Sequence, residues 1–106
     1  MKPIDQFITL VEDEKFEEAH EVLEHDWIRF KKEDKKEYAL FYKGLINGAT
    51  SIALIRRGRS QRARDVTWGA FMRYREYIGY SCVSNRDRYV EAIELIEVKR
   101  DKFILG

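Results

Sequence analysis

The sequence predicts an all-α protein, a compact bundle of about five helices joined by short loops. Apolar residues recur three and four positions apart, as on one face of a helix, through most of the 106 residues. No segment alternates apolar and polar residues in the manner of a half-buried strand. The stretches between the helical patterns are short and charged or contain glycine. At this length we expect one domain over residues 1–106.

The first two predicted helices occupy the N-terminal third. Pro3 suits the first position of a helix, and a helical apolar pattern runs from there to about residue 13. Residues 12–15 (Glu-Asp-Glu-Lys), a mainly acidic stretch, make a short connection. From Phe16 the same spacing resumes, which predicts one continuous helix that ends in the charged run of residues 31–36.

Residues 37–57 are apolar almost all round and predict the central, most buried helix. Gly44, Gly48 and Ser51 fall together on one side of it. Since a glycine inside a helix costs about 1 kcal/mol, we expect another backbone to approach that side closely. Residues 56–58 (Arg-Arg-Gly) form a stop signal, in which cations meet the negative helix end and Gly58 takes the left-handed cap.

Two further helices follow. Ser60 can cap a fourth helix, which ends near Gly79. Its predicted buried stripe is Ala63, Val66, Thr67, Ala70, Phe71, Tyr74, Tyr77 and Ile78. Ser84 with Asp87 resembles a capping box that opens a fifth helix, whose period fades toward Phe103.

Composition excludes several classes of protein. The lone Cys82 cannot form an internal disulfide, and no cysteine and histidine array has the spacing of a zinc finger. No stretch approaches the roughly 20 apolar residues that span a bilayer, and the N-terminus lacks the apolar core of a signal peptide. We therefore expect a cytoplasmic protein with no membrane partner.

The net charge of +1 is the sum of an acidic N-terminal segment and a basic central segment. Residues 1–34 carry 5 basic and 11 acidic side chains, whereas residues 35–90 carry 12 basic and 4 acidic ones. Opposite charges on neighbouring helices attract. We expect the acidic second helix to lie against the basic fourth helix.

The second helix carries the side chains best suited to chemistry. At about 100° per residue from Phe16, His20 and Glu24 fall on the shoulder of the buried face, and Glu17 falls close to Glu24. An imidazole and a carboxylate four residues apart can supply one nitrogen and one oxygen ligand to a divalent metal. They can equally form one partly buried structural pair. Both interpretations stay open.

The spacing His20-x-x-x-Glu24-x-x-Trp27 resembles the hallmark of a known family, the domain of unknown function family numbered three hundred and nine. These are small helical proteins often labelled predicted metal-dependent hydrolases. Residues 41–46 (Phe-x-x-Gly-Leu-Ile) and residues 56–58 resemble the family's second block, with Gly44 inside it. The resemblance covers about residues 16–63.

The resemblance implies that His20 and Glu24 bind a divalent metal and that any enzymatic activity is metal-dependent hydrolysis. The chain departs from the family pattern at two positions: Asn47 replaces a frequent glutamine, and Leu54 replaces a common histidine. A catalytic zinc normally has three protein ligands. Glu17 or a tyrosine is the third ligand that the chain offers.

Two other functions compete with a metal or small-ligand site. Trp68 and Met72 lie off the buried stripe of the fourth helix and suggest a docking surface or a homodimer seam, in which case the His20 and Glu24 pair is structural. The arginines of residues 56–75 suggest a nucleic-acid binder. Because these arginines flank both sides of the stripe, we favour ordinary solvated helix faces.

Overall fold

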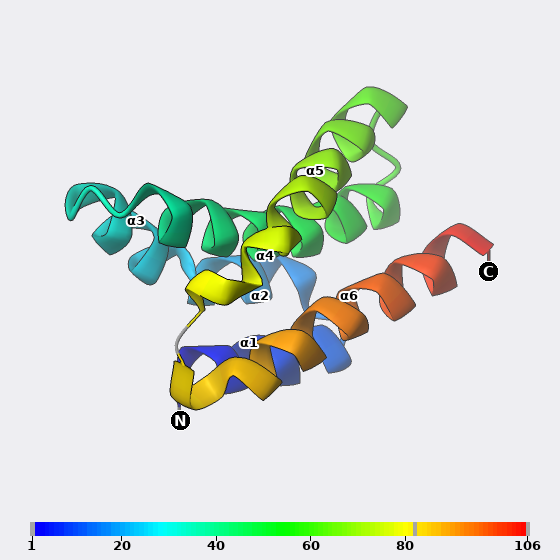
Figure 1. Ribbon diagram of the computed structural model, residues 1–106. Helices are drawn as coiled ribbons and strands as arrows, with labels where there is room; N and C mark the ends of the chain where they lie inside the picture. Colours follow the sequence, from blue (N-terminus) through cyan, green and yellow to red (C-terminus); the bar gives the residue numbers. More distant parts are fainter. Residues whose placement is uncertain (1, 82, 106) are drawn as a thin grey trace.

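The computed structural model describes residues 2–81 and 83–105, so Cys82 lies outside the described residues. Over this range the chain forms α-helices and two short 3₁₀ helices, with no strand, which confirms the all-α fold class (Figure 1). In chain order the elements are α1 (Pro3–Glu12), α2 (Phe16–Val22), α3 (Glu24–Lys32), α4 (Lys36–Arg56), α5 (Gln61–Tyr74), η1 (Arg75–Tyr80), η2 (Val83–Asn85) and α6 (Arg86–Leu105). No helix of the described ranges is both long and apolar enough to cross a membrane.

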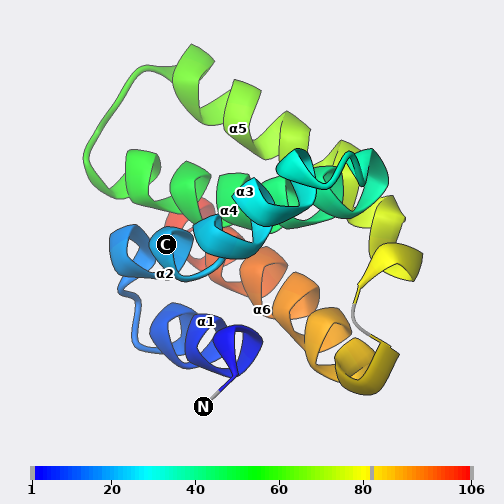
Figure 2. The ribbon, with the colours of Figure 1, turned by 90° about the vertical axis from the view of Figure 1, so that its left-hand side faces the viewer.

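The long helix α4 is the element on which the others assemble. It contacts α2, α3, α5, η1 and α6, while α1 packs between α2 and α6 (Figures 1 and 2). Buried residues occur along its length, from Ala39 to Ala53. This confirms the prediction that residues 37–57 form the central helix.

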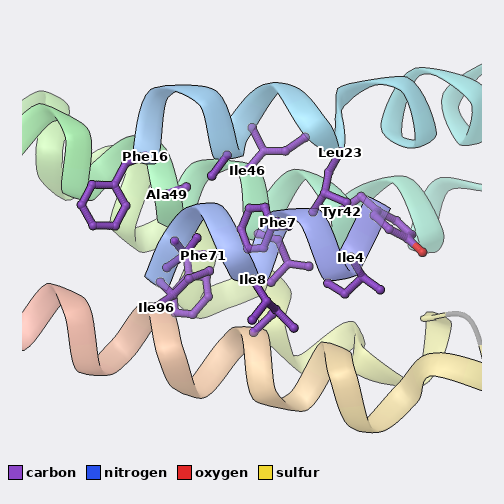
Figure 3. Close-up of a cluster of buried hydrophobic side chains, with 14 of the residues drawn as sticks. Ile4, Phe7, Ile8, Phe16, Leu23, Tyr42, Ile46, Ala49, Phe71 and Ile96 are labelled. Carbon is purple, nitrogen blue, oxygen red and sulfur yellow. The ribbon is translucent and has the colours of Figure 1, made fainter. Parts of the chain in front are cut away.

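The core gathers side chains from α1, α2, α4, α5 and α6 (Figure 3). Fully burying one such aliphatic or aromatic side chain contributes about 1.5–3 kcal/mol. The largest buried side chains are Phe7, Phe16, Phe41, Phe71, Ile4, Ile8, Leu23, Leu45, Ile52 and Ile96. The apolar spacing in the sequence therefore identified most of the core.

The predicted continuous helix from Phe16 is wrong, because the chain breaks into α2 and α3 at Leu23. Leu23 has φ −95° and ψ −6° and is fully buried. No glycine or proline marks the break. Its cause is tertiary: α2 packs on both α1 and α4, whereas α3 packs on α4. The change of direction lets each half follow its own neighbours.

Close approach of α5 to the small-residue side of α4 is confirmed. A Cβ atom on Gly44 would lie 2.8 Å from the Cβ atom of Tyr74, and one on Gly48 would lie 2.8 Å from Cδ1 of Phe71. The hydroxyl of Ser51, the next residue on this side, donates to a backbone carbonyl of α5 at 3.0 Å. The packing of α5 leaves no room for a side chain at Gly44, and the packing of α5 and of Ile96 on α6 leaves none at Gly48.

The predicted stop after α4 is also confirmed. Gly58 has φ +67°, its N–H donates to the carbonyl of Ile55 at 3.0 Å, and the next N–H donates to the carbonyl of Leu54 at 3.0 Å. The same pair of hydrogen bonds closes α1 and α3, with Glu14 (φ 61°) and Asp34 (φ 58°) in the left-handed position. A left-handed residue other than glycine costs roughly 1–2 kcal/mol.

The Ser60 cap of the predicted fourth helix is confirmed, since its Oγ accepts from the N–H of Ala63 at 3.3 Å. Three other features of the predicted fourth and fifth helices are corrected. Helix α5 ends at Tyr74 and continues as the 3₁₀ helix η1, and α6 begins at Arg86 after η2. Val66 is 63% exposed rather than buried. The predicted stripe was too wide, because Ala70 and Phe71 are the residues of α5 that are buried.

The expected contact between the acidic and the basic helix is wrong. The acidic helices α2 and α3 pack on α4 rather than on α5. Among the described residues, an ion pair joins the acidic helix α2 to the arginine-rich turn of residues 56–58, between Glu17 Oε1 and Arg57 Nε at 3.3 Å. Apolar packing, not charge pairing, decides which helices are neighbours. The arginines of α5 are therefore not neutralised by α2.

Candidate functional site

The His20 and Glu24 side chains meet, as their spacing predicts. Nε2 of His20 and Oε1 of Glu24 are 3.4 Å apart, and the two side chains are 31% and 42% exposed. That separation is longer than a well-formed N–H···O hydrogen bond of about 2.7–3.2 Å. The pair joins the last turn of α2 to the first residue of α3, across the break at Leu23. An exposed pair of this kind contributes about 0–1 kcal/mol to stability.

Glu17 does not join this pair, since its carboxylate faces Arg57. Within residues 2–81 and 83–105, no three histidine, cysteine, aspartate or glutamate side chains lie close enough together to hold a metal ion. A catalytic zinc site normally takes three ligands from the protein. His20 and Glu24 alone can offer one nitrogen and one oxygen donor.

The other motif residues serve separate purposes. Trp27 is half-buried against the core, and Nζ of Lys31 lies 4.7 Å from its ring centroid. Gly44 faces α5, not the His20 pair. The side-chain amide of Asn47 donates to the backbone carbonyl of Lys43 at 2.9 Å, one turn back on its own helix.

Trp27 forms part of the wall of a pocket between α3 and the start of α4. The pocket has a volume of about 280 Å³. We term it the lysine pocket, and its lining residues are Trp27, Lys31, Asp34, Lys36, Ala39, Leu40 and Lys43. It combines an apolar wall with three ammonium groups and one carboxylate.

Sequence reasoning missed the lysine pocket, because the charged run of residues 31–36 resembles a solvated helix end. Two signals were available in the sequence. Trp27 and Lys31 are four residues apart on one helix, and Leu40 and Lys43 are three apart on the next. Such pairs share a helix face, and a short connection brings the two helices together.

The proposed Trp68 and Met72 ridge is partly covered. The Trp68 ring lies 4.6 Å from the ring of Phe71, and the guanidinium of Arg100 on α6 lies 4.2 Å from the Trp68 centroid. Met72 remains 37% exposed. The use of this ridge as an interface stays a prediction.

Several arginines of residues 56–75 have partners within the protein. Arg57 pairs with Glu17, and Arg75 pairs with Glu97 on α6. Arg56 donates to a backbone carbonyl of the α1–α2 connection. Nucleic-acid binding through these arginines stays a prediction.

Comparison with known proteins gives one match. A family model described as a domain of unknown function (DUF309) matches residues 4–66. The matched range includes His20, Glu24 and Trp27 and the whole lysine pocket. It confirms the resemblance expected from residues 16–63 and extends it to α1. No curated protein and no solved structure matches the chain.

Proposed function

The chain belongs to the DUF309 family of domains of unknown function, and we propose that it is a small-ligand-binding protein whose lysine pocket takes a small organic anion with an aromatic or other apolar part. One observation carries this proposal: the tryptophan that ends the family's His-x-x-x-Glu-x-x-Trp motif and three lysines line the same pocket.

The apolar part of the ligand is inferred from the wall. Trp27 on α3 and Ala39 and Leu40 on α4 line the cavity with apolar side chains. Ligand pockets are mostly apolar and commonly measure about 300–1,000 Å³. At about 280 Å³ the lysine pocket suits a ligand of roughly one ring.

The negative charge of the ligand is inferred from the rim. Lys31, Lys36 and Lys43 line the cavity, and Asp34 is the one carboxylate among its lining residues. A cavity of one dominant charge raises the local concentration of oppositely charged solutes. The Lys31 ammonium over the Trp27 ring places charge and aromatic surface together.

We assign His20 and Glu24 a positioning role beside this pocket. The pair spans the α2–α3 break, and Trp27 follows Glu24 by three residues on α3. The pair adds a weak contact between α2 and α3, one turn before Trp27 on α3. The metal that the family resemblance implies would have two donors here, and no third histidine, cysteine, aspartate or glutamate joins them among the described residues.

The proposal is tested by titrating the protein with phenylacetate and with its neutral analogue phenylacetamide, using the indole N–H of Trp27 in NMR spectra as the reporter. We expect saturable shifts with phenylacetate and much smaller ones with phenylacetamide. Lys43→Gln should weaken phenylacetate binding by about threefold to tenfold. Lys32→Gln, on the same helix as Lys31 but outside the lining, is the matched control. Equal binding of both compounds, or equal loss in both variants, would refute the proposal.

We further infer a cytoplasmic location and a single domain over residues 1–106. A lone cysteine suits a reducing compartment, where disulfides are rare. The apolar core draws on helices from α1 to α6, which supports one cooperative unit. Coincident unfolding transitions by fluorescence and circular dichroism are expected for one domain.

A further inference from the structure

A second pocket lies at the other end of α4. There α4 ends and α5 begins, and α6 ends on the same side of the molecule (Figure 1). Its volume is about 290 Å³. We term it the arginine pocket, and its lining residues are Ile55, Gln61, Arg64, Arg100, Phe103 and Ile104. It brings together two guanidinium groups from different helices and three apolar side chains.

Both guanidinium groups are incompletely satisfied. The Nε atoms of Arg64 and Arg100 are buried, and neither has a hydrogen-bond partner in the part of the chain that the structure describes. Arg64 donates through another nitrogen to Gln61, and Arg100 lies over the Trp68 ring at 4.2 Å. A buried N–H of a charged group without an acceptor is costly. Such groups are unusual in folded proteins and call for an explanation.

The electrostatics of the pocket favour an added negative charge. Burial is the main reason that the pKa of Arg100 is lowered, and the nearby Arg64 charge lowers it further. Asp101 and Asp65 act in the opposite direction. Neither aspartate is among the lining residues of the pocket. The lining of the pocket thus contains two cations and no carboxylate.

We infer that the arginine pocket binds a phosphate monoester whose apolar part lies against Ile55, Phe103 and Ile104. Guanidinium groups bind phosphate oxygens through paired N–H donors in a planar fork. A phosphate monoester carries about −1.5 to −2 charges near neutral pH, which matches two guanidinium groups better than a carboxylate does. Ile104 is 49% exposed, so the apolar surface is open to a ligand.

This inference is independent of the proposed function. The two pockets share no lining residue. Lys43 and Ile55 are separated along α4 by about 18 Å, at about 1.5 Å per residue. Failure of one site therefore leaves the other intact.

The experiment measures binding of phenyl phosphate by calorimetry in a Trp27→Phe background, with Trp68 fluorescence as a second signal. The background variant removes the tryptophan wall of the lysine pocket and leaves Trp68 as the single tryptophan. We expect saturable binding and a change in Trp68 emission, because Arg100 covers that ring. Arg64→Lys and Arg100→Lys keep the charge and lose the fork, and each should weaken binding at least about tenfold.

Arg62→Lys is the matched control, since Arg62 is an exposed arginine of α5 outside the pocket lining. It should bind phenyl phosphate as the background protein does. The inference is overturned if phenyl phosphate shows no saturable binding, if Arg62→Lys weakens binding as much as Arg64→Lys, or if benzoate binds equally well. Melting curves identify a variant that fails to fold, and Arg64→Lys and Arg100→Lys serve as independent variants for this purpose.

Discussion

The two pockets at opposite ends of α4 are built in different ways. The lysine pocket is local in sequence, drawn from residues 27–43 and contained in the family match over residues 4–66. The arginine pocket joins residues 55–64 to residues 100–104 of α6, which lies outside that match. Lys31, Lys36 and Lys43 are exposed, whereas Arg64 and Arg100 are only partly exposed. Residues close together in the sequence thus bring exposed lysines to one pocket. Packing between helices far apart in the sequence is needed to bury the two arginines partly.

The largest expected effect comes from Gly48→Ala, which should break the arginine pocket alone. A Cβ atom there would meet Cδ1 of Phe71 at 2.8 Å and Cγ2 of Ile96 at 3.0 Å. Overpacking a filled core typically costs about 1–3 kcal/mol, and we expect about 3 kcal/mol because α5 and α6 are both displaced. Chemical denaturation measures this loss in the free energy of unfolding.

The control for that change is Gly69→Ala, within α5. A Cβ atom at Gly69 would meet nothing within 4 Å, so the protein should become about 0.5–1 kcal/mol more stable through helix propensity. Phenyl phosphate binding should fall in Gly48→Ala and persist in Gly69→Ala. Phenylacetate binding should persist in both. Equal stability of the two variants would contradict the tight α4–α5 contact.

The next largest difference is expected in how ligand binding at the two pockets depends on ionic strength. Salt screens exposed charges more than partly buried ones. Between about 0.05 and about 0.5 M NaCl we expect phenylacetate binding to weaken about tenfold and phenyl phosphate binding about threefold. Parallel titrations at each salt concentration measure both. The same salt response at both sites would show that the burial of the arginines has no effect on binding.

A smaller effect is expected at the His20 and Glu24 pair. His20→Ala should lower the free energy of unfolding by less than about 1 kcal/mol, because both side chains are substantially exposed. Wild type and His20→Ala should show the same change in melting temperature on adding Zn²⁺, since a third donor is missing from the described residues. A zinc-dependent stabilisation that His20→Ala abolishes would instead establish the metal site that the family resemblance implies.

The smallest effect concerns Glu14, which ties the α1–α2 connection to α6. Hydrogen bonds from Lys102 and Lys99 lower the pKa of Glu14 from 4.5 to about 2. The folded state therefore favours the ionised carboxylate, and this contribution is present above pH 4.5 and is lost as the pH falls toward 2. Glu14→Gln should flatten the acid side of the stability curve in that window. An unchanged curve in denaturation experiments at several pH values would contradict the ion pairs with α6.

Several features were predictable because they depend on residues within one or two turns. The Pro3 start, the Ser60 cap and the Gly58 stop each act on neighbouring backbone groups. The meeting of His20 and Glu24 follows from their spacing of four. The break at Leu23 was not predictable, because no helix-breaking residue stands there and its cause is the packing of α2 on α1.

The sequence by itself determined the all-α class, most helix ends, the apolar faces and the family, since these depend on local spacing and short motifs. Only the tertiary structure decided which helices are neighbours, and hence that α2 does not neutralise α5. It also decided that Arg64 and Arg100, far apart in the sequence, line one pocket with buried Nε atoms. The physical reason is that the burial of a side chain and the clustering of charged groups depend on contacts between segments far apart in the sequence. Helical spacing does not specify those contacts.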